Sequence, residues 1–183
     1  MRLMVVVEFL GKHRRDIIVF LIELLVVFLI ALFLTKVVIV NAKVPSSSME
    51  PTIMTGDRLI GDRIFYKGHL SRYDVVIFRY PDDESQLFIK RILGMPGDTI
   101  EAKGGHIYIN GSLDMRAQRM AAEPLNSDFG PYTVPKGHYF MLGDNRNHSM
   151  DSRFWNDPFV SEDEIVGKAL FIYYPFSDIG EIK

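Results

Sequence analysis

The stretch IIVFLIELLVVFLIALFL, from Ile17 to Leu34, contains eighteen residues and one charge, Glu23. At the helical rise it spans about 27 Å, close to the hydrocarbon thickness of a bilayer. A buried core helix is the alternative, but a helix in so small a protein has one apolar face rather than an apolar circumference. With the apolar residues that follow, the stretch predicts a transmembrane anchor over residues 17–40. Glu23 is costly at that depth and would be protonated, reach the interface or pair with a partner helix.

Three cations, Lys12, Arg14 and Arg15, come immediately before this span, and fewer follow it closely. The excess of positive charge predicts a cytoplasmic segment at residues 1–16 and an extracytoplasmic domain at residues 41–183. A cleavable signal peptide is the alternative interpretation. Its apolar core would be longer than usual, which favours an uncleaved, single-pass anchor in the cytoplasmic membrane.

The composition excludes several classes of protein. The 183 residues carry 21 Lys and Arg against 23 Asp and Glu, a net charge of −2, which argues against a basic nucleic-acid binder. A hydrophobic content of 48% argues against a disordered chain. The absence of cysteine excludes disulfide scaffolds, thiolate zinc sites and cysteine nucleophiles. Because the sequence also has no metal-ligand cluster or phosphate-cradling loop, we expect no cofactor, no metal and no nucleic-acid partner.

Beyond the span, the sequence predicts a mainly β domain. Short β-branched or aromatic runs alternate with Gly, Pro and Asn turn signals, which is typical of a β-rich barrel or sandwich. The expected strands are Arg58–Tyr66, Val75–Tyr80, Leu87–Leu93, Ile107–Asn110, Tyr139–Leu142 and Ala169–Tyr174. Residues 112–134 lack periodicity and are interpreted as a variable polar insertion.

Three polar segments in this domain are candidates for chemistry. The first, VPSSSMEPT at 44–52, would ordinarily be a linker, but Met49 and Ile53 give it apolar anchors that a linker does not need. The second, FIKRILGMPGD at 88–98, places charges inside an apolar strand. The third, GDNRNHSMDSR at 143–153, follows an apolar strand and is dense in hydrogen-bonding side chains.

The charges of the second segment lie on opposite faces of the predicted strand. Alternation places Phe88 with Lys90, and Ile89 with Arg91, so one charge approaches a packed face. A buried Lys90 would have a lowered pKa and supply a neutral amine. The pattern by itself favours the alternative, an edge lysine that prevents aggregation.

The third segment allows two local ion pairs and one competing catalytic arrangement. Asp151 has the spacing to pair with Arg153, and Asp144 has the same spacing to Arg146. His148 raises the prospect of a Ser/His arrangement, although a loop histidine is more often a solvated bystander.

Together, these segments resemble the bacterial type I signal peptidases, membrane-bound serine proteases that remove signal peptides from exported proteins. The resemblance covers almost the whole chain. It rests on Pro-Ser-x-Ser-Met-x-Pro-Thr at 45–52, Lys-Arg-x-x-Gly-x-Pro-Gly-Asp at 90–98 and Gly-Asp-Asn-Arg-x-x-Ser-x-Asp-Ser-Arg at 143–153, all behind a membrane span. It reverses the edge interpretation of the lysine and implies a catalytic domain of the signal peptidase type.

The resemblance implies a role for each matching residue. Ser48 matches the nucleophile and Lys90 the general base of a Ser-Lys dyad. Ser46 matches the hydroxyl that forms the oxyanion hole with the Ser48 N–H, and Ser149 the serine that orients the lysine. Structural support is implied for Asp144, Arg146, Asp151 and Arg153, and a shallow substrate pocket for Val44, Pro45, Met49, Ile53, Phe88 and Ile89.

The implied reaction is endoproteolytic removal of signal peptides from preproteins through an acyl-enzyme, on the outer side of the membrane. The implied partners are preproteins, the lipid bilayer and a nearby secretion translocon. The chain departs from the family pattern at Ser47, where glycine is usual, at Glu50, and at Asn147-His148. These departures affect the expected substrate preference and leave the dyad intact.

Three alternative functions remain at this point. Self-cleaving repressors share a Ser-Lys dyad and a related β fold, but they are soluble. A membrane-anchored adaptor would keep the motifs as scaffold, and a dedicated peptidase would differ in its substrates. Phe154 and Trp155 are candidate anchors in the membrane interface. For Trp155 the alternative is ordinary packing in the core.

Overall fold

The computed structural model describes residues 14–183. It divides into a helical unit that ends at Val38 and a β unit formed by Ile39–Lys183. The helical unit contains α2 (Arg14–Phe33) and a π-helical turn (Leu34–Val38). This helix is long and apolar enough to cross a membrane, and no residue of its apolar window is buried. Residues 1–13, which make up most of the segment predicted to be cytoplasmic and include Lys12, lie outside the described residues.

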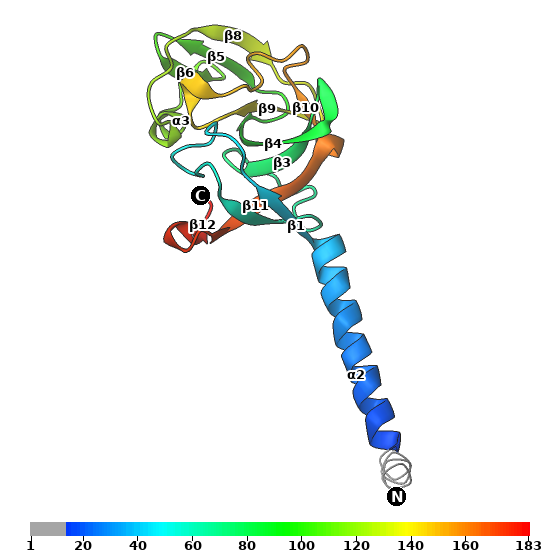
Figure 1. Ribbon diagram of the computed structural model, residues 1–183. Coiled ribbons are helices and arrows are strands. Elements are labelled where there is room, and N and C mark those ends of the chain that lie inside the picture. The colour runs from blue at the N-terminus through cyan, green and yellow to red at the C-terminus, as the bar shows by residue number, and fades with distance from the viewer. Residues whose placement is uncertain (1–13) are drawn as a thin grey trace, which may run out of the picture. The chain divides into compact units, whose positions relative to one another are not determined.

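The β unit consists of two antiparallel sheets (Figure 1). The larger sheet has the order β1-β2-β11-β3-β4-β9-β10, with β12 paired to β11. Its strands are β1 (Ile39–Lys43), β2 (Arg58–Asp62), β3 (Val75–Tyr80), β4 (Asp83–Gly94), β9 (His138–Leu142), β10 (Val160–Ser161), β11 (Ile165–Tyr174) and β12 (Gly180–Glu181). The smaller sheet has the order β7-β6-β5-β8. It comprises β5 (Thr99–Lys103), β6 (His106–Ile109), β7 (Ser112–Leu113) and β8 (Phe129–Thr133), and helix α3 (Met115–Met120) follows β7.

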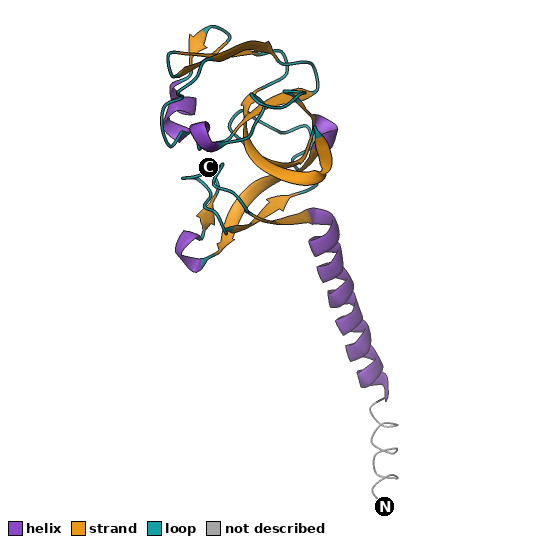
Figure 2. Cartoon of the chain, turned by 45° about the horizontal axis from the view of Figure 1, so that its top comes forward, coloured by secondary structure: helices purple, strands orange, loops and turns teal. Residues whose placement is uncertain are grey.

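Strand β3 has side chains buried in apolar clusters on both faces of the larger sheet. Val75 and Ile77 enter one apolar cluster, whereas Val76 and Phe78 enter another. Successive side chains of a strand point to opposite faces, so a run of four buried residues requires cover on both sides. Register shifts interrupt the pairing of β11 with β3 and the pairing of β4 with β9, and Figure 2 shows the larger strands as curved. This curvature allows one sheet to enclose its own core.

The prediction of a mainly β architecture with an apolar N-terminal helix is confirmed. Strand β3 has the predicted bounds, and β4 and β11 are longer than expected. The stretch predicted as a polar insertion at 112–134 contains α3 and β8, and β8 pairs with β5 as a member of the smaller sheet.

Trp155 belongs to the core rather than to an exposed surface. It is 6% exposed, and its ring centroid lies 5.5 Å from that of Tyr80 and 5.8 Å from that of Phe78. This packing decides between the two interpretations of the tryptophan. Its neighbour Phe154 is exposed.

Candidate active site

The segment that carries Ser48 is a loop between β1 and β2 that is held by hydrogen bonds and buried side chains, here called the serine loop (Val44–Asp57). Its ends are joined by backbone hydrogen bonds, because the Val44 N–H donates to the Asp57 carbonyl at 2.9 Å and the Gly56 N–H to the Val44 carbonyl at 2.8 Å. Gly56 has φ +98°, a conformation that glycine adopts without strain. The apolar side chains of Met49 and Ile53 are buried in the core beneath it. These anchors hold the loop in one conformation, which a linker would not have.

Lys90 reaches Ser48 from the strand β4. Its Nζ donates a hydrogen bond of 2.7 Å to Ser48 Oγ and one of 3.1 Å to the Ile89 carbonyl. Strand pairing with β3, in which Lys90 is opposite Val76, fixes the position of the lysine in the sheet. The two side chains come from segments 42 residues apart, so the tertiary fold rather than local sequence creates this contact.

The surroundings of Lys90 disfavour its charged form. The residue is 4% exposed, and the Phe88 ring centroid lies 5.3 Å from its Nζ. Burial lowers the pKa of Lys90 to about 8, and the carboxylates of Asp151 and Asp144 oppose this shift. About a tenth of the lysine is therefore a neutral amine at pH 7, and about half at pH 8.

Ser46 and Ser149 occupy different positions around the dyad. The Ser46 and Ser48 hydroxyl oxygens are 3.3 Å apart, and Ser46 is exposed to the cleft. Ser149 Oγ is buried without a hydrogen-bond partner in the described part of the chain. The orienting contact with Lys90 that the resemblance implies for Ser149 is therefore absent, and Lys90 donates to Ser48 and to the Ile89 carbonyl.

Gly143 lies where the serine loop meets the polar loop, the name used here for Gly143–Arg153. A Cβ added at Gly143 would collide with the Ser149 hydroxyl and with the Ser48 carbonyl oxygen. The absence of a side chain at this position lets the two loops approach each other closely.

The predicted ion pair between Asp151 and Arg153 is formed, and it shapes the polar loop. Arg153 Nε donates to Asp151 Oδ1 at 2.7 Å, and both side chains are almost fully buried. The same carboxylate accepts the Gly143 N–H at 3.1 Å, while the Arg153 guanidinium also donates to the Arg146 carbonyl. The pair thus joins three points of one loop.

The predicted pairing of Asp144 with Arg146 is wrong. Asp144 accepts two hydrogen bonds from Arg91, of 2.8 Å and 2.6 Å, and both side chains are fully buried. Strand pairing explains the choice, since Arg91 is opposite Leu142, two residues before Asp144. Thr52 of the serine loop donates a third hydrogen bond to this carboxylate at 2.6 Å.

Arg146 binds backbone carbonyls instead. Its guanidinium donates to the carbonyls of Gly143 and Ala117, at 3.0 Å and 2.9 Å. Burial lowers the pKa of Arg146 to about 10, against the opposing effect of nearby carboxylates. Arg146 therefore joins the polar loop to Ala117 through backbone carbonyls rather than through Asp144.

The sequence interpretation did not single out three residues of the site: Arg91, Thr52 and Asn145. Alternation did place Arg91 on the face opposite Lys90, and both residues prove to be buried. Asn145 donates from its backbone N–H to the Ser48 carbonyl and from its side-chain amide to the Ser47 carbonyl, each at 3.1 Å. The signal for Asn145 was its place among the hydrogen-bonding residues of the third segment.

A mostly apolar cleft of about 470 Å³ lies over the dyad. One wall is formed by residues 42–46 and the other by residues 86–90 of β4. Five of the predicted pocket residues line it, namely Val44, Pro45, Met49, Phe88 and Ile89, together with Leu87, His148 and Met150. Ile53 does not line the cleft, because it is fully buried in the core under the serine loop.

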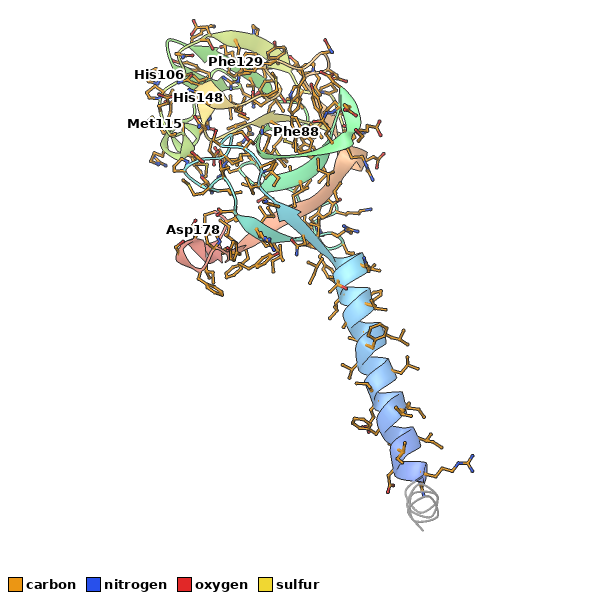
Figure 3. The ribbon with its side chains drawn as sticks, in the orientation of Figure 1. Phe88, His106, Met115, Phe129, His148 and Asp178 are labelled. Atoms are coloured by element: carbon orange, nitrogen blue, oxygen red, sulfur yellow. The ribbon has the colours of Figure 1, made fainter. Side chains whose placement is uncertain are left out.

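His148 lies at the rim of the cleft and takes no part in the dyad. Its side chain is exposed, and its Nδ1 lies 3.2 Å from Asn145 Oδ1. Phe88 and His148 are both labelled in Figure 3. Within residues 14–183, no group of three or more His, Asp or Glu side chains is arranged to hold a metal ion.

Comparison with known proteins gives a consistent family. A family model described as signal peptidase, peptidase S26, matches residues 14–174. The chain is 36% identical over 171 residues to signal peptidase I P of Bacillus subtilis subsp. natto, which covers 88% of this chain and 89% of that protein. It is also 36% identical over 169 residues to signal peptidase I T of Bacillus subtilis, covering 87% and 86%.

In two further comparisons the aligned region covers a smaller share of one of the two chains. The chain is 38% identical over 143 residues to the probable signal peptidase I-2 of Synechocystis sp., covering 75% of this chain and 64% of that protein. Among solved structures, a signal peptidase I from Enterococcus faecalis V583 matches with 34% identity over 54% of this chain and 95% of that chain, with a TM-score of 0.45.

Proposed function

The chain belongs to the signal peptidase family, peptidase S26, and we propose that it is a signal peptidase I in which Ser48 is the nucleophile and Lys90 the general base. The observation that carries this proposal is the 2.7 Å hydrogen bond between Lys90 Nζ and Ser48 Oγ in a buried, apolar environment. A serine hydroxyl needs a base that is unprotonated at the working pH. The lowered pKa of Lys90 meets that need.

The reaction begins with the neutral amine of Lys90. It accepts the Ser48 proton as the serine oxygen attacks the scissile carbonyl carbon, and a tetrahedral intermediate forms. The Ser48 N–H and the Ser46 hydroxyl stabilise the negative oxygen. The Lys90 ammonium then protonates the leaving amine, so the mature protein departs with its new amino terminus.

An acyl-enzyme remains, in which the signal peptide is esterified to Ser48. Lys90, neutral again, accepts a proton from the water that attacks this ester. The signal peptide leaves with a free carboxylate, and the Ser48 hydroxyl is restored. Ser149 lies beside Gly143, and no hydrogen bond joins it to Lys90 in the described part of the chain, so no step is assigned to it.

The substrate binds in extended form along the cleft. Strand β4 pairs with β9 from Arg91 onward, which leaves the edge of its preceding residues available at the cleft. An added strand satisfies main-chain hydrogen bonds at such an edge. Shallow apolar walls near Val44 and Ile89 favour the small side chains that precede a signal-peptide cleavage site.

The apolar helix α2 anchors the enzyme in the cytoplasmic membrane, with the segment before it on the cytoplasmic side and the β unit outside. Signal-peptide-bearing preproteins are its substrates, and they reach it in the bilayer beside the secretion translocon. The segments 1–16, 17–40 and 41–183 thus act as tail, anchor and catalytic domain, except that Ile39 and Val40 belong to β1 of the catalytic domain.

Covalent labelling distinguishes this enzyme from a membrane-anchored adaptor. A serine-directed acylating inhibitor should add one equivalent of mass to the full-length protein in detergent, mapped to Ser48. Labelling should vanish in Ser48→Ala, fall by at least about 100-fold in rate in Lys90→Met, and persist in the matched control Ser47→Ala. An unlabelled wild type, or equal rates in Lys90→Met, would refute the dyad.

A further inference from the structure

One residue of the polar loop holds two consecutive carbonyls of the serine loop. The Asn145 side-chain amide donates to the Ser47 carbonyl and its backbone N–H to the Ser48 carbonyl, both at 3.1 Å. The Glu50 N–H also donates to the Ser47 carbonyl, at 3.1 Å. The peptide groups on both sides of the Ser48 Cα are therefore fixed from the Asn145 side.

These hydrogen bonds determine the direction of the Ser48 N–H. The peptide that joins Ser47 to Ser48 is trans and planar, so its carbonyl and its N–H point in opposite directions. Because the Ser47 carbonyl points toward Asn145, the Ser48 N–H points away from Asn145. That N–H donates to no group within residues 14–183, and Ser48 lines the cleft. A free, fixed donor beside the nucleophile is what a developing oxyanion requires.

The orientation of the Asn145 amide is itself fixed. Its Oδ1 lies 3.2 Å from His148 Nδ1, while a separate bond of 3.0 Å from the His148 backbone N–H to the Asn145 backbone carbonyl holds the two residues in one turn. Reversing the amide would place Oδ1 against the Ser47 carbonyl oxygen, and two acceptors cannot form a hydrogen bond. The donor end of the amide therefore remains directed at Ser47.

We propose that Asn145 is a positioning residue that aims the Ser48 N–H at the oxyanion of the tetrahedral intermediate. The inference rests on the proposed Ser-Lys peptidase function. Asn145 acts through the peptide of the nucleophile: within residues 14–183 it forms no hydrogen bond with Lys90, and it is not among the residues that line the cleft.

Asn145→Leu tests this role in the full-length protein in detergent. Leucine nearly preserves the shape of asparagine but cannot donate, so the Ser47 carbonyl loses one of its two donors. With a signal-peptide-derived substrate we expect kcat to fall by about 10- to 100-fold, which does not exceed the fall in kcat that follows removal of a whole oxyanion donor. We expect KM to change by less than about threefold. The matched control is Asn147→Leu, in the same turn as Asn145. The Asn147 side chain hydrogen-bonds to the backbones of Pro124 and Asn126, and its replacement should change kcat by less than about twofold.

Two further readouts separate positioning from a merely structural role. A peptide boronic acid, which forms a tetrahedral adduct with the serine, should bind Asn145→Leu weaker by the same factor by which kcat/KM falls. The apparent pKa of the kcat/KM profile should equal that of the wild type, because the surroundings of Lys90 are unchanged. If Asn145→Leu does not fold, as judged by its melting curve, Asn145→Ala takes its place in the same assays.

The outcomes are distinct. Equal kcat in Asn145→Leu and Asn147→Leu, a rise confined to KM, or unchanged boronate affinity would each overturn the positioning role. Ser48→Ala and Lys90→Met are measured alongside. If either keeps wild-type activity, the proposed function itself fails, whereas their inactivity together with an active Asn145→Leu refutes the positioning role and leaves the dyad in place.

Discussion

The buried lysine gives the activity a definite pH dependence. In the proposed mechanism the base works as a neutral amine, and the fraction of neutral Lys90 rises with pH through its lowered pKa of about 8. We therefore predict that kcat/KM rises about tenfold per pH unit below about 8 and levels off above it. Initial rates of peptide cleavage between pH 6 and pH 10 measure this profile. A rate that climbs toward the ordinary lysine pKa above 10 would show that burial does not tune the base.

Gly143 sets how closely the two loops can approach at the dyad. In Gly143→Ala the new methyl group meets the Ser48 carbonyl and the Ser149 hydroxyl, so the two loops must move relative to each other and the Ser48–Lys90 geometry is disturbed. A misplacement of this kind costs about 100-fold in kcat. The control is Gly180→Ala, where the nearest atom to an added Cβ is 3.9 Å away and activity should be retained. Wild-type kcat in Gly143→Ala would contradict the close approach.

At the scale of elements, the Arg91–Asp144 pair joins β4 to the polar loop and, through Thr52, to the serine loop. Removal of one partner leaves a buried charge without compensation, which typically costs about 3–5 kcal/mol. We predict that Arg91→Met lowers the free energy of unfolding by about that amount in urea titrations. Lys103→Ala, which removes a pair with a largely exposed lysine, should change it by less than about 1 kcal/mol. Equal unfolding midpoints for the two variants would contradict this assignment.

The elements also show what the sequence could and could not reveal. The apolar run Val75–Tyr80 indicated a strand, and the three polar segments indicated the site. Strand β8 was missed because its sequence, FGPYT, contains a Gly-Pro pair that is typical of a turn. It is an edge strand of the smaller sheet, where a proline is tolerated because one side of the strand needs no ladder hydrogen bond.

The partner of Asp144 could not be read from the sequence for a different reason. Local spacing offered Arg146, two residues away, whereas the chosen partner is 53 residues away. Pairing across β4 and β9 places Arg91 beside the carboxylate, and that register is a property of the tertiary fold. Contacts made by local motifs, such as Asp151 with Arg153, were predictable because the spacing itself creates them.

At the scale of the molecule, the β unit contains its own core, and that core includes part of β1. Val40 of β1 is buried in it, as is Val44, the first residue of the serine loop. We predict that a fragment of residues 36–183 melts cooperatively and cleaves a short peptide with kcat within about tenfold of the full-length chain, since each element that bears the site is retained. A fragment of residues 45–183 should lose the cooperative transition because it lacks β1. Circular dichroism melting of both fragments decides the matter, and a stable 45–183 fragment would contradict the structural role of β1.

The most direct test of the Ser-Lys assignment is preprotein processing by the full-length protein in liposomes, with the amino terminus of the product mapped by mass spectrometry. Wild type should cut after a small-x-small sequence, His148→Ala should cut at a rate within about threefold of wild type because its side chain is solvated at the rim, and Lys90→Met should yield no product. Cleavage at the same bond by Lys90→Met would contradict the account, because no base would then remain beside Ser48.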